Sequence, residues 1–223
     1  MNYAFTQTLL NDPDVLTQLT EYIDKHGIRT NFEKGQVLFF QNTPVSSFFY
    51  IHDGLIKLHR QHGKDRCSVL KVEKGNHFAG LSDCFTQTSH YLSATTITKS
   101  DVSILDAGML IEFISSQPGL SETIMTLLAQ EATYFLERLS NRHHKQLPGK
   151  VADTLLYFWD LLGENHQFCF PLSRLELAQF AGTTKESLIR TLTEFKNDRI
   201  INMDDRQVEI NSMEILKTLC RLG

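Results

Sequence analysis

The stretch that decides the fold is Leu175-Glu-Leu-Ala-Gln-Phe-Ala-Gly-Thr-Thr-Lys-Glu-Ser-Leu-Ile-Arg-Thr-Leu192. Its spacing predicts two short helices joined by a sharp turn. A small residue, Ala178, lets the helices cross closely near their first turns, and Gly182 permits the turn itself. An apolar residue six positions later, Leu188, can pack the second helix back on the first. The stretch therefore predicts a helix-turn-helix.

The flanking residues extend this motif. Leu192 and Phe195 continue the buried face of the second helix, and Lys185, Glu186, Ile189 and Arg190 are left pointing outward. The segment Ser173-Arg-Leu-Glu176 has the form of a capping box, which predicts that the first helix begins there. Two apolar strands around an Asp-Asp turn, within Ile200–Ile210, predict a wing hairpin. Upstream of the motif we expect a helix over Val151–Leu162 and a short hairpin containing the strand Phe168-Cys-Phe170.

Residues 28 to about 106 have a different pattern. Short runs rich in β-branched and aromatic residues alternate with turn signals, and a strand every 8 to 12 residues is typical of a sandwich or barrel. The dipeptide Asp53-Gly54 between two apolar runs predicts a hairpin. The predicted strands include Val37–Phe40, Phe48–Ile51, Leu55–Leu58 and Ser68–Val72.

Apolar residues recur at helical spacing from about Leu120 to Leu139, directly after the turn signal Pro118-Gly119. The apolar positions cover more than one narrow stripe, so the helix can pack on its own β-rich domain and on a second copy. The alternative is a single helix that only caps the sandwich.

Composition sets limits on the class of protein. The chain has 223 residues, 41% hydrophobic residues and a formal net charge of -4. Four scattered cysteines, Cys67, Cys84, Cys169 and Cys220, predict reduced thiols in a cytoplasm. The start MNYAFTQTLLNDPD has no pattern of a secretion signal, and no apolar run reaches the length of a membrane span. From Pro148 onward nine Lys and Arg stand against eleven Asp and Glu, so binding to DNA needs local placement of positive charge.

These features together resemble the CRP/FNR family of bacterial transcription regulators over about 190 residues. The C-terminal third matches at Ser173-Arg174, Gly182, Thr184-Lys185-Glu186, Arg190 and Ile200-Ile201, and the N-terminal part at Phe32–Gln41, Phe49–Leu58 and Lys74-Gly75-Asn76. The resemblance implies an α+β chain with a cyclic-nucleotide-binding-type β-roll over 1–118, a dimerisation helix and hinge over 119–147, and a winged helix-turn-helix over 148–223. The resemblance implies a homodimer that regulates transcription from a palindromic DNA site. It is also compatible with RNA polymerase as a further partner.

The resemblance also assigns roles to residues. Arg190 would donate to guanine and Glu186 would accept from cytosine, and Lys185 and Arg174 would contact phosphates. Alternatively, Glu186 completes a capping box with Thr183, and Arg190 only pairs with Glu186 on a solvated face. Expected DNA-binding residues are Arg174, Thr183, Thr184, Lys185, Glu186, Ser187 and Arg190, and expected dimerisation residues are Ile124, Leu128 and Phe135.

The sequence departs from the cAMP-binding members of the family, which hold the nucleotide with a Gly-Glu pair and a later Arg. The matching stretch is Phe78-Ala-Gly-Leu81, without Glu, and Lys99 is the only Lys or Arg from His90 to Val102. We therefore do not expect cAMP. With no cysteine before Cys67, we do not expect the iron–sulfur cluster of the oxygen-sensing branch. Haem, with His77 or His90 as its ligand, is left as an open alternative. No metal site is predicted, and the sequence does not identify the effector.

Two other classes of function are a protein-interaction module and an enzyme. The acidic balance of residues 148–223 is compatible with a winged helix that serves as a protein-interaction module without reading DNA. The nucleotide-binding Gly-x-x-x-x-Gly-Lys, the zinc-protease His-Glu-x-x-His and the hydrolase Gly-x-Ser-x-Gly patterns do not occur, so we do not expect an enzyme.

Overall fold

The computed structural model describes residues 13–64, 66–86, 88–163 and 165–223. These residues form two compact units: the N-terminal unit ends at Tyr134 and the C-terminal unit begins at Phe135, with Arg66–Val69 grouped with the latter. Residues 1–12, which include most of the stretch in which we expected no secretion signal, lie outside the described part of the chain.

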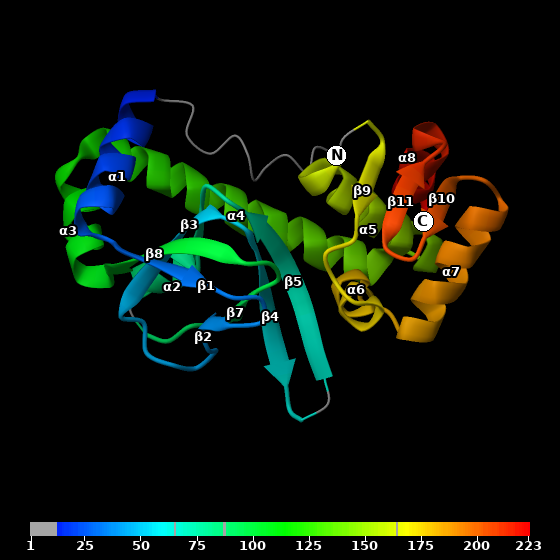
Figure 1. Cartoon of the computed structure of the whole chain (residues 1–223), viewed down its shortest axis with the longest axis horizontal. Helices are drawn as coiled ribbons and strands as arrows, with labels where there is room; N and C mark the ends of the chain where they lie inside the picture. The colour runs from blue at the N-terminus through cyan, green and yellow to red at the C-terminus, as the bar shows by residue number, and fades with distance from the viewer. Residues whose placement is uncertain (1–12, 65, 87, 164) are drawn as a thin grey trace. The chain divides into compact units, whose positions relative to one another are not determined.

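The N-terminal unit is built on two antiparallel sheets (Figure 1). The first strand begins at Ile28 and the last ends at Asp106, as the sequence pattern predicts. One sheet has the order β1-β8-β3-β6 and the other β2-β7-β4-β5. The strands are β1 (Ile28–Phe32), β2 (Val37–Phe39), β3 (Ser47–Asp53), β4 (Leu55–His62), β5 (Arg66–Lys74), β6 (His77–Ala79), β7 (Ser93–Thr96) and β8 (Ser100–Asp106).

The expected hairpin at Asp53-Gly54 is wrong in one respect, because β3 and β4 belong to different sheets. Gly54 has a φ of +107°, a region that L side chains rarely adopt. A Cβ at this position would lie 2.3 Å from Ser100 Oγ and 2.8 Å from the carbonyl oxygen of Lys99. The glycine therefore carries the chain from one sheet to the other, past the start of β8.

Four helices belong wholly or partly to this unit: α1 (Pro13–His26), α2 (Leu81–Thr86), α3 (Ala107–Ser116) and the first part of α4 (Pro118–His144). The first three were not expected from the sequence. The core of the unit joins apolar residues of helices and strands, among them Leu19 of α1, Phe48 of β3, Leu110 of α3 and Ile124 of α4. Each of these four side chains is at most 2% exposed.

Helix α4 is longer than its apolar period predicts, since it begins at Pro118 and ends at His144. Proline is tolerated in the first turn because its missing N–H has no partner there in any case. At the other end Arg142, His143 and His144 form a basic last turn, and positive charge at a helix C-terminus is favourable.

The C-terminal unit has the element order predicted around the helix-turn-helix, with one correction. Phe168 lies on a single strand that pairs with Val208 of the wing, so the expected upstream hairpin is instead the third strand of a sheet with the order β10-β11-β9. The elements are α5 (Leu147–Leu162), β9 (Gln167–Cys169), α6 (Arg174–Ala181), α7 (Lys185–Asn197), β10 (Ile201–Asp204), β11 (Gln207–Ile210) and α8 (Met213–Leu222).

A buried carboxylate ties these helices together. Asp153 on α5 is 2% exposed, and its Oδ2 accepts from Nη1 of Arg138 at 2.7 Å. Its Oδ1 accepts from Nζ of Lys145 at 2.7 Å and from Nδ2 of Asn141 at 3.1 Å. Arg138 also donates from Nη2 to the carbonyl oxygen of Phe180 on α6, at 2.7 Å, and its guanidinium carbon lies 4.0 Å from the centre of the Phe180 ring. The C-terminal end of α4, the first half of α5 and the last turn of α6 are thus joined through one cluster of charges.

Replacing Asp153 by Ala should lower the free energy of unfolding of this unit by about 3–5 kcal/mol, because it leaves buried cations without a counter-charge. The single tryptophan, Trp159 on α5, reports the transition in urea by fluorescence. Glu194→Ala is the matched control, since it breaks an exposed Arg–Glu pair, which is worth about 0.3–0.5 kcal/mol. Equal losses from the two variants would contradict the assigned role of Asp153.

Candidate DNA-binding surface

The first helix of the motif, α6, starts where the sequence pattern places it. Ser173 is the N-cap residue, and its backbone N–H donates to Oε2 of Glu176 at 2.9 Å, while the N–H of Glu176 donates back to Ser173 Oγ at 3.3 Å. Gly182 ends the helix in the left-handed conformation, with a φ of +70°. The capping box and the turn glycine are therefore both confirmed.

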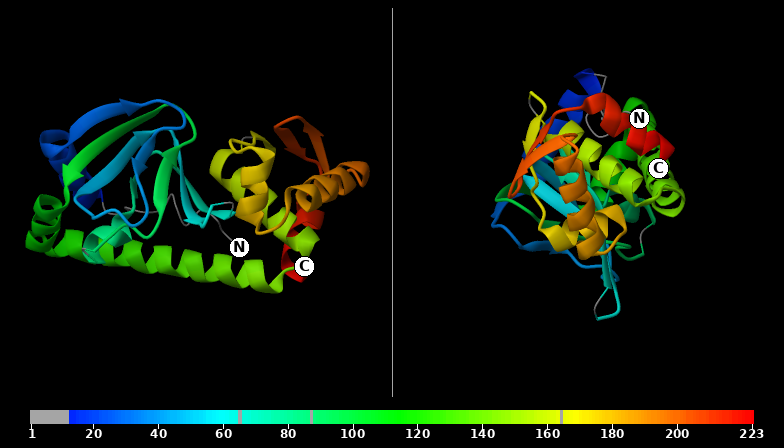
Figure 2. Two further views of the ribbon diagram at one scale, coloured as in Figure 1. Left: turned by 90° about the horizontal axis from the view of Figure 1, so that it is seen from below. Right: turned by 90° about the vertical axis from the view of Figure 1, so that its right-hand side faces the viewer.

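The packing between α6 and α7 also follows the predicted positions. Ala178 and Leu188 are each 1% exposed, and Leu192 and Phe195 continue the buried face of α7. Figure 2 shows the hairpin of β10 and β11 next to α7, in the place of a wing. The local fold is a winged helix-turn-helix.

The outer face of α7 is the part of this motif that can meet a ligand. Lys185, Glu186 and Arg190 are exposed there, together with Ile189. Thr184 is exposed at the start of the helix, and Thr183 and Ser187 are half-buried beside it. The structure thus gathers six of the seven expected DNA-binding residues on the first two turns of α7 and the turn before it.

The alternative capping box for Glu186 is wrong, and the alternative ion pair of Arg190 has a different partner. The N-cap residue is Thr184, whose Oγ1 accepts from the backbone N–H of Ser187 at 3.2 Å, so Glu186 does not close a capping box with Thr183. Arg190 pairs with Glu194 rather than with Glu186, and its Nε lies 3.9 Å from Glu194 Oε1. Both side chains of that pair are more than half exposed, so the pair holds Arg190 only weakly.

Arg174, the seventh expected residue, is placed differently from the other six. Its Nη2 donates to the carbonyl oxygen of Asp205 at the tip of the wing and lies 3.5 Å from Met203 Sδ. The guanidinium lies over the ring of Phe170, and burial lowers the pKa of Arg174. From the other side Lys196 of α7 donates to the carbonyl oxygen of Met203 at 2.7 Å. Two cations therefore fix the wing, a role that the sequence pattern did not indicate.

The residues expected at a dimer interface are also placed differently. Ile124 is 2% exposed and belongs to the core of the N-terminal unit, so it is not available to a second copy. Leu128 packs against the edge of the same core, and Phe135 is half-buried. The outer side of α4 instead carries Met125, Leu136 and Leu139, each more than 60% exposed.

In the β-roll, the two positions that depart from the cAMP-binding pattern hold an apolar side chain and a surface lysine. Leu81 is buried, and Lys99 is exposed, with its Nζ 4.0 Å from Glu33 Oε1. His90 is buried, its ring stacks on Phe39 and its Nδ1 lies 3.3 Å from Asp83 Oδ2. This aromatic and polar packing accounts for the burial of His90 without a ligand.

Two family models match the chain in succession. The cyclic nucleotide-binding domain matches residues 29–117, and the Crp-like helix-turn-helix domain matches residues 149–219. The chain belongs to the CRP/FNR family of transcription regulators.

Relatives of this CRP/FNR regulator are similar over most of its length. The "CRP-like cAMP-activated global transcriptional regulator" of Mycobacterium tuberculosis is 24% identical over 214 residues, which cover 94% of each chain. The structure of FixK2 from Bradyrhizobium japonicum has a TM-score of 0.80 at 18% identity and covers 86% of this chain and 96% of its own. The c-di-GMP responsive global regulator CLP of Xanthomonas campestris has a TM-score of 0.75 at 17% identity, over 87% and 98%.

These comparisons support a DNA-binding regulator rather than a winged helix used only for protein contacts. Among the described residues of this CRP/FNR regulator, no helix combines the length and the apolar character needed to span a bilayer.

The start of α7 offers a direct test of the local geometry. Thr184→Ala should lower the free energy of unfolding of the CRP/FNR regulator by about 1 kcal/mol, because the N–H of Ser187 loses its acceptor. Thr183→Ala, one residue before the cap, should change it by less than about 0.5 kcal/mol. Urea denaturation without DNA measures both. A larger loss from Thr183→Ala than from Thr184→Ala would contradict the assignment of Thr184 as the N-cap residue.

Proposed function

We propose that this CRP/FNR regulator binds a two-fold symmetric DNA site as a homodimer and that α7 of each copy reads bases in the major groove. The observation that carries the proposal is the outer face of α7, where Lys185, Glu186 and Arg190 project from a helix whose other face is buried. A recognition helix enters the groove with its N-terminal turns against the base edges.

Each residue on this face has a chemistry that DNA can use. The guanidinium of Arg190 can donate two hydrogen bonds to guanine O6 and N7, and the carboxylate of Glu186 can accept from cytosine N4. Lys185 and the hydroxyl groups of Thr183, Thr184 and Ser187 can bind phosphates, which position the helix without selecting a sequence.

Arg174 has a different role in this proposal from the phosphate contact that the resemblance implied. Its hydrogen bond to the carbonyl oxygen of Asp205 holds the tip of the wing, so its effect on DNA is indirect. The neighbouring Arg206, at the same tip, is exposed and can contact the backbone beside the groove.

The outer side of α4 supports the homodimer. Met125, Ala132 and Leu139 follow one another at intervals of seven residues, as do Ala129 and Leu136, and all five are exposed. A seven-residue repeat of apolar side chains is typical of helices that pair along a seam. A solvent-exposed row of this kind favours burial against a second copy.

The signal that acts on the β-roll is not assigned. Two proteins similar to this one are described as responding to different nucleotides, cAMP in Mycobacterium tuberculosis and c-di-GMP in Xanthomonas campestris. In this chain Leu81 is apolar and Lys99 lies at the surface, so neither supplies the contact by which cAMP-binding members hold the cyclic phosphate. As a DNA-binding regulator the protein would act in the bacterial cytoplasm.

Base reading predicts a difference between specific and non-specific DNA. Arg190→Ala should weaken binding to the operator by about 1–3 kcal/mol and leave binding to random duplexes nearly unchanged. Lys185→Ala should weaken both alike, and Glu194→Ala, which only frees Arg190 from its exposed pair, should weaken neither. Titration by fluorescence anisotropy measures all four chains, and equal losses on both DNAs for Arg190→Ala would refute base reading by that residue.

The exposed apolar row on α4, from Met125 to Leu139, forms the seam of the proposed dimer and predicts the oligomeric state. The double variant Leu136→Asp and Leu139→Asp should sediment as a monomer, because it places four carboxylates in one interface. It should bind operator DNA far more weakly, since one copy reaches only one half-site. Glu137→Ala, on the same helix but off the seam, is the control. A double variant that stays dimeric would place the interface elsewhere.

A further inference from the structure

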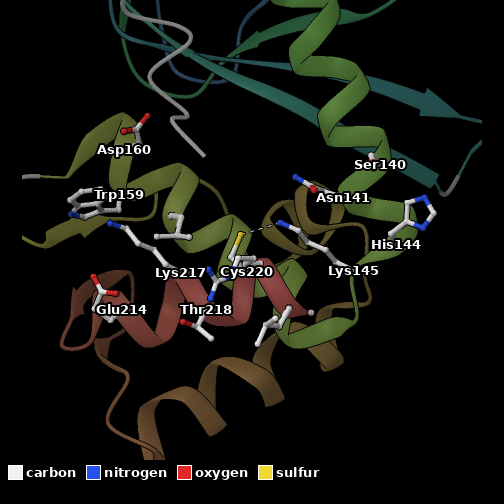
Figure 3. A pocket seen from close by; sticks show the side chains of 14 residues that line it. Ser140, Asn141, His144, Lys145, Trp159, Asp160, Glu214, Lys217, Thr218 and Cys220 are labelled. Carbon is white, nitrogen blue, oxygen red and sulfur yellow. Dashed lines mark hydrogen bonds between the residues drawn. The ribbon is translucent and has the colours of Figure 1, made fainter.

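A cavity of about 930 Å³ lies within the C-terminal unit, away from the outer face of α7. It is lined by the end of α4, by α5 and by α8, including Asn141, Lys145, Trp159, Lys217 and Cys220 (Figure 3). Neither DNA binding nor dimerisation, as proposed above, uses these residues together.

At this cavity a cysteine and a lysine lie in contact. Nζ of Lys145 lies 3.0 Å from Sγ of Cys220, and Figure 3 shows the two side chains joined in this way. The same ammonium lies 2.7 Å from Oδ1 of Asp153, and the thiol lies 3.6 Å from that oxygen. Cys220 is 4% exposed, but it belongs to the lining of the cavity, through which a molecule as small as a peroxide can reach the sulfur.

We propose that Lys145 and Cys220 form a site of oxidative modification, at which a peroxide converts the contact into a covalent bridge from Nζ through one oxygen atom to Sγ. The contact distance supports this product, because a single oxygen atom can be inserted between the nitrogen and the sulfur with little movement of either side chain. The proposal does not rest on the proposed DNA binding.

The chemistry balances with two molecules of hydrogen peroxide. The first transfers an oxygen atom to the sulfur, which becomes a sulfenic acid, and leaves as water. The ammonium of Lys145 gives a proton to Asp153 or to solvent, and its nitrogen then bonds to the sulfenic oxygen. The second peroxide accepts the two electrons and two protons released in that step and becomes two waters. One thiol, one amine and two peroxides thus give one bridge and three waters.

The site suits the first step as well as the product. A cysteine attacks peroxide through negatively charged sulfur, and the ammonium of Lys145 lies where it can stabilise the charge that develops. Cys84 in the N-terminal unit is equally buried but lacks this setting. Its sulfur faces the carbonyl oxygens of Ser47 and Gly80, and burial raises the pKa of its thiol to about 12.

The bridge would join positions 75 residues apart in the sequence. A cross-link over a long loop restricts the unfolded chain and stabilises the folded state. This gain is opposed by the loss of the positive charge of Lys145 beside Asp153, so the linked peptides and not the melting temperature report the bridge.

The test is mass spectrometry of the full-length reduced protein before and after hydrogen peroxide, on a Cys169→Ser background that removes an exposed thiol. We expect a gain of one oxygen atom less two hydrogen atoms, a linked pair of peptides containing Lys145 and Cys220, and reversal by dithiothreitol. Lys145→Arg keeps the positive charge beside Asp153 but should abolish the linked peptides, and Cys220→Ser should do the same.

Two results would overturn the proposal. One is a Cys220 that gains two or three oxygen atoms with Lys145 still unlinked. The other is a Cys220 that stays unmodified at peroxide concentrations that oxidise Cys67. Cys84 is the internal control, and it should stay unmodified while the bridge forms.

Discussion

The C-terminal unit depends on how the carboxylate of Asp153 is neutralised. A carboxylate in the interior is strongly unfavourable unless cations and hydrogen-bond donors surround it. Arg138 and Lys145 supply the charges, Asn141 supplies a further donor, and all three come from the end of α4 and the residue just after it. Because Arg138 also holds the carbonyl oxygen of Phe180, the same cluster fixes α6 against α5 and α4.

The position of α7 follows from this arrangement. Its inner face packs on α6 through Leu188, and its first turn is set by the αL conformation of Gly182 and the cap at Thr184. What is left for a ligand is a short outer face with cationic, acidic and hydroxyl side chains. Residues 148–223 carry nine Lys and Arg against eleven Asp and Glu, so attraction to the DNA backbone is local. Affinity for a particular site then has to come from contacts with bases, and the wing held by Arg174 and Lys196 adds to the positioning.

The sequence predicted those parts of the molecule whose signals are local. The capping box at Ser173, the glycine at 182 and the apolar spacing of α7 each act within one or two helical turns, and they were confirmed. Other features depend on residues far apart along the chain, which periodicity cannot detect. The contact of Arg138 with Phe180 spans 42 residues, and that of Arg174 with Asp205 spans 31. Gly54 looked like the centre of a hairpin because the sequence does not show that its two strands join different sheets. Ile124 fitted an interface for a similar reason, since the apolar period of α4 serves its own domain on one side and leaves a different row exposed on the other.

The most direct test of the account is selection of bound duplexes from a random pool by the purified full-length protein. Two copies of α7 presented by a two-fold dimer predict an enriched motif with inverted half-sites whose centres lie about 10–10.5 base pairs apart. The same selection with Arg190→Ala should lose information at one guanine–cytosine pair in each half-site and keep the spacing. A pool that shows no enrichment, or a motif without two-fold symmetry, would contradict the account.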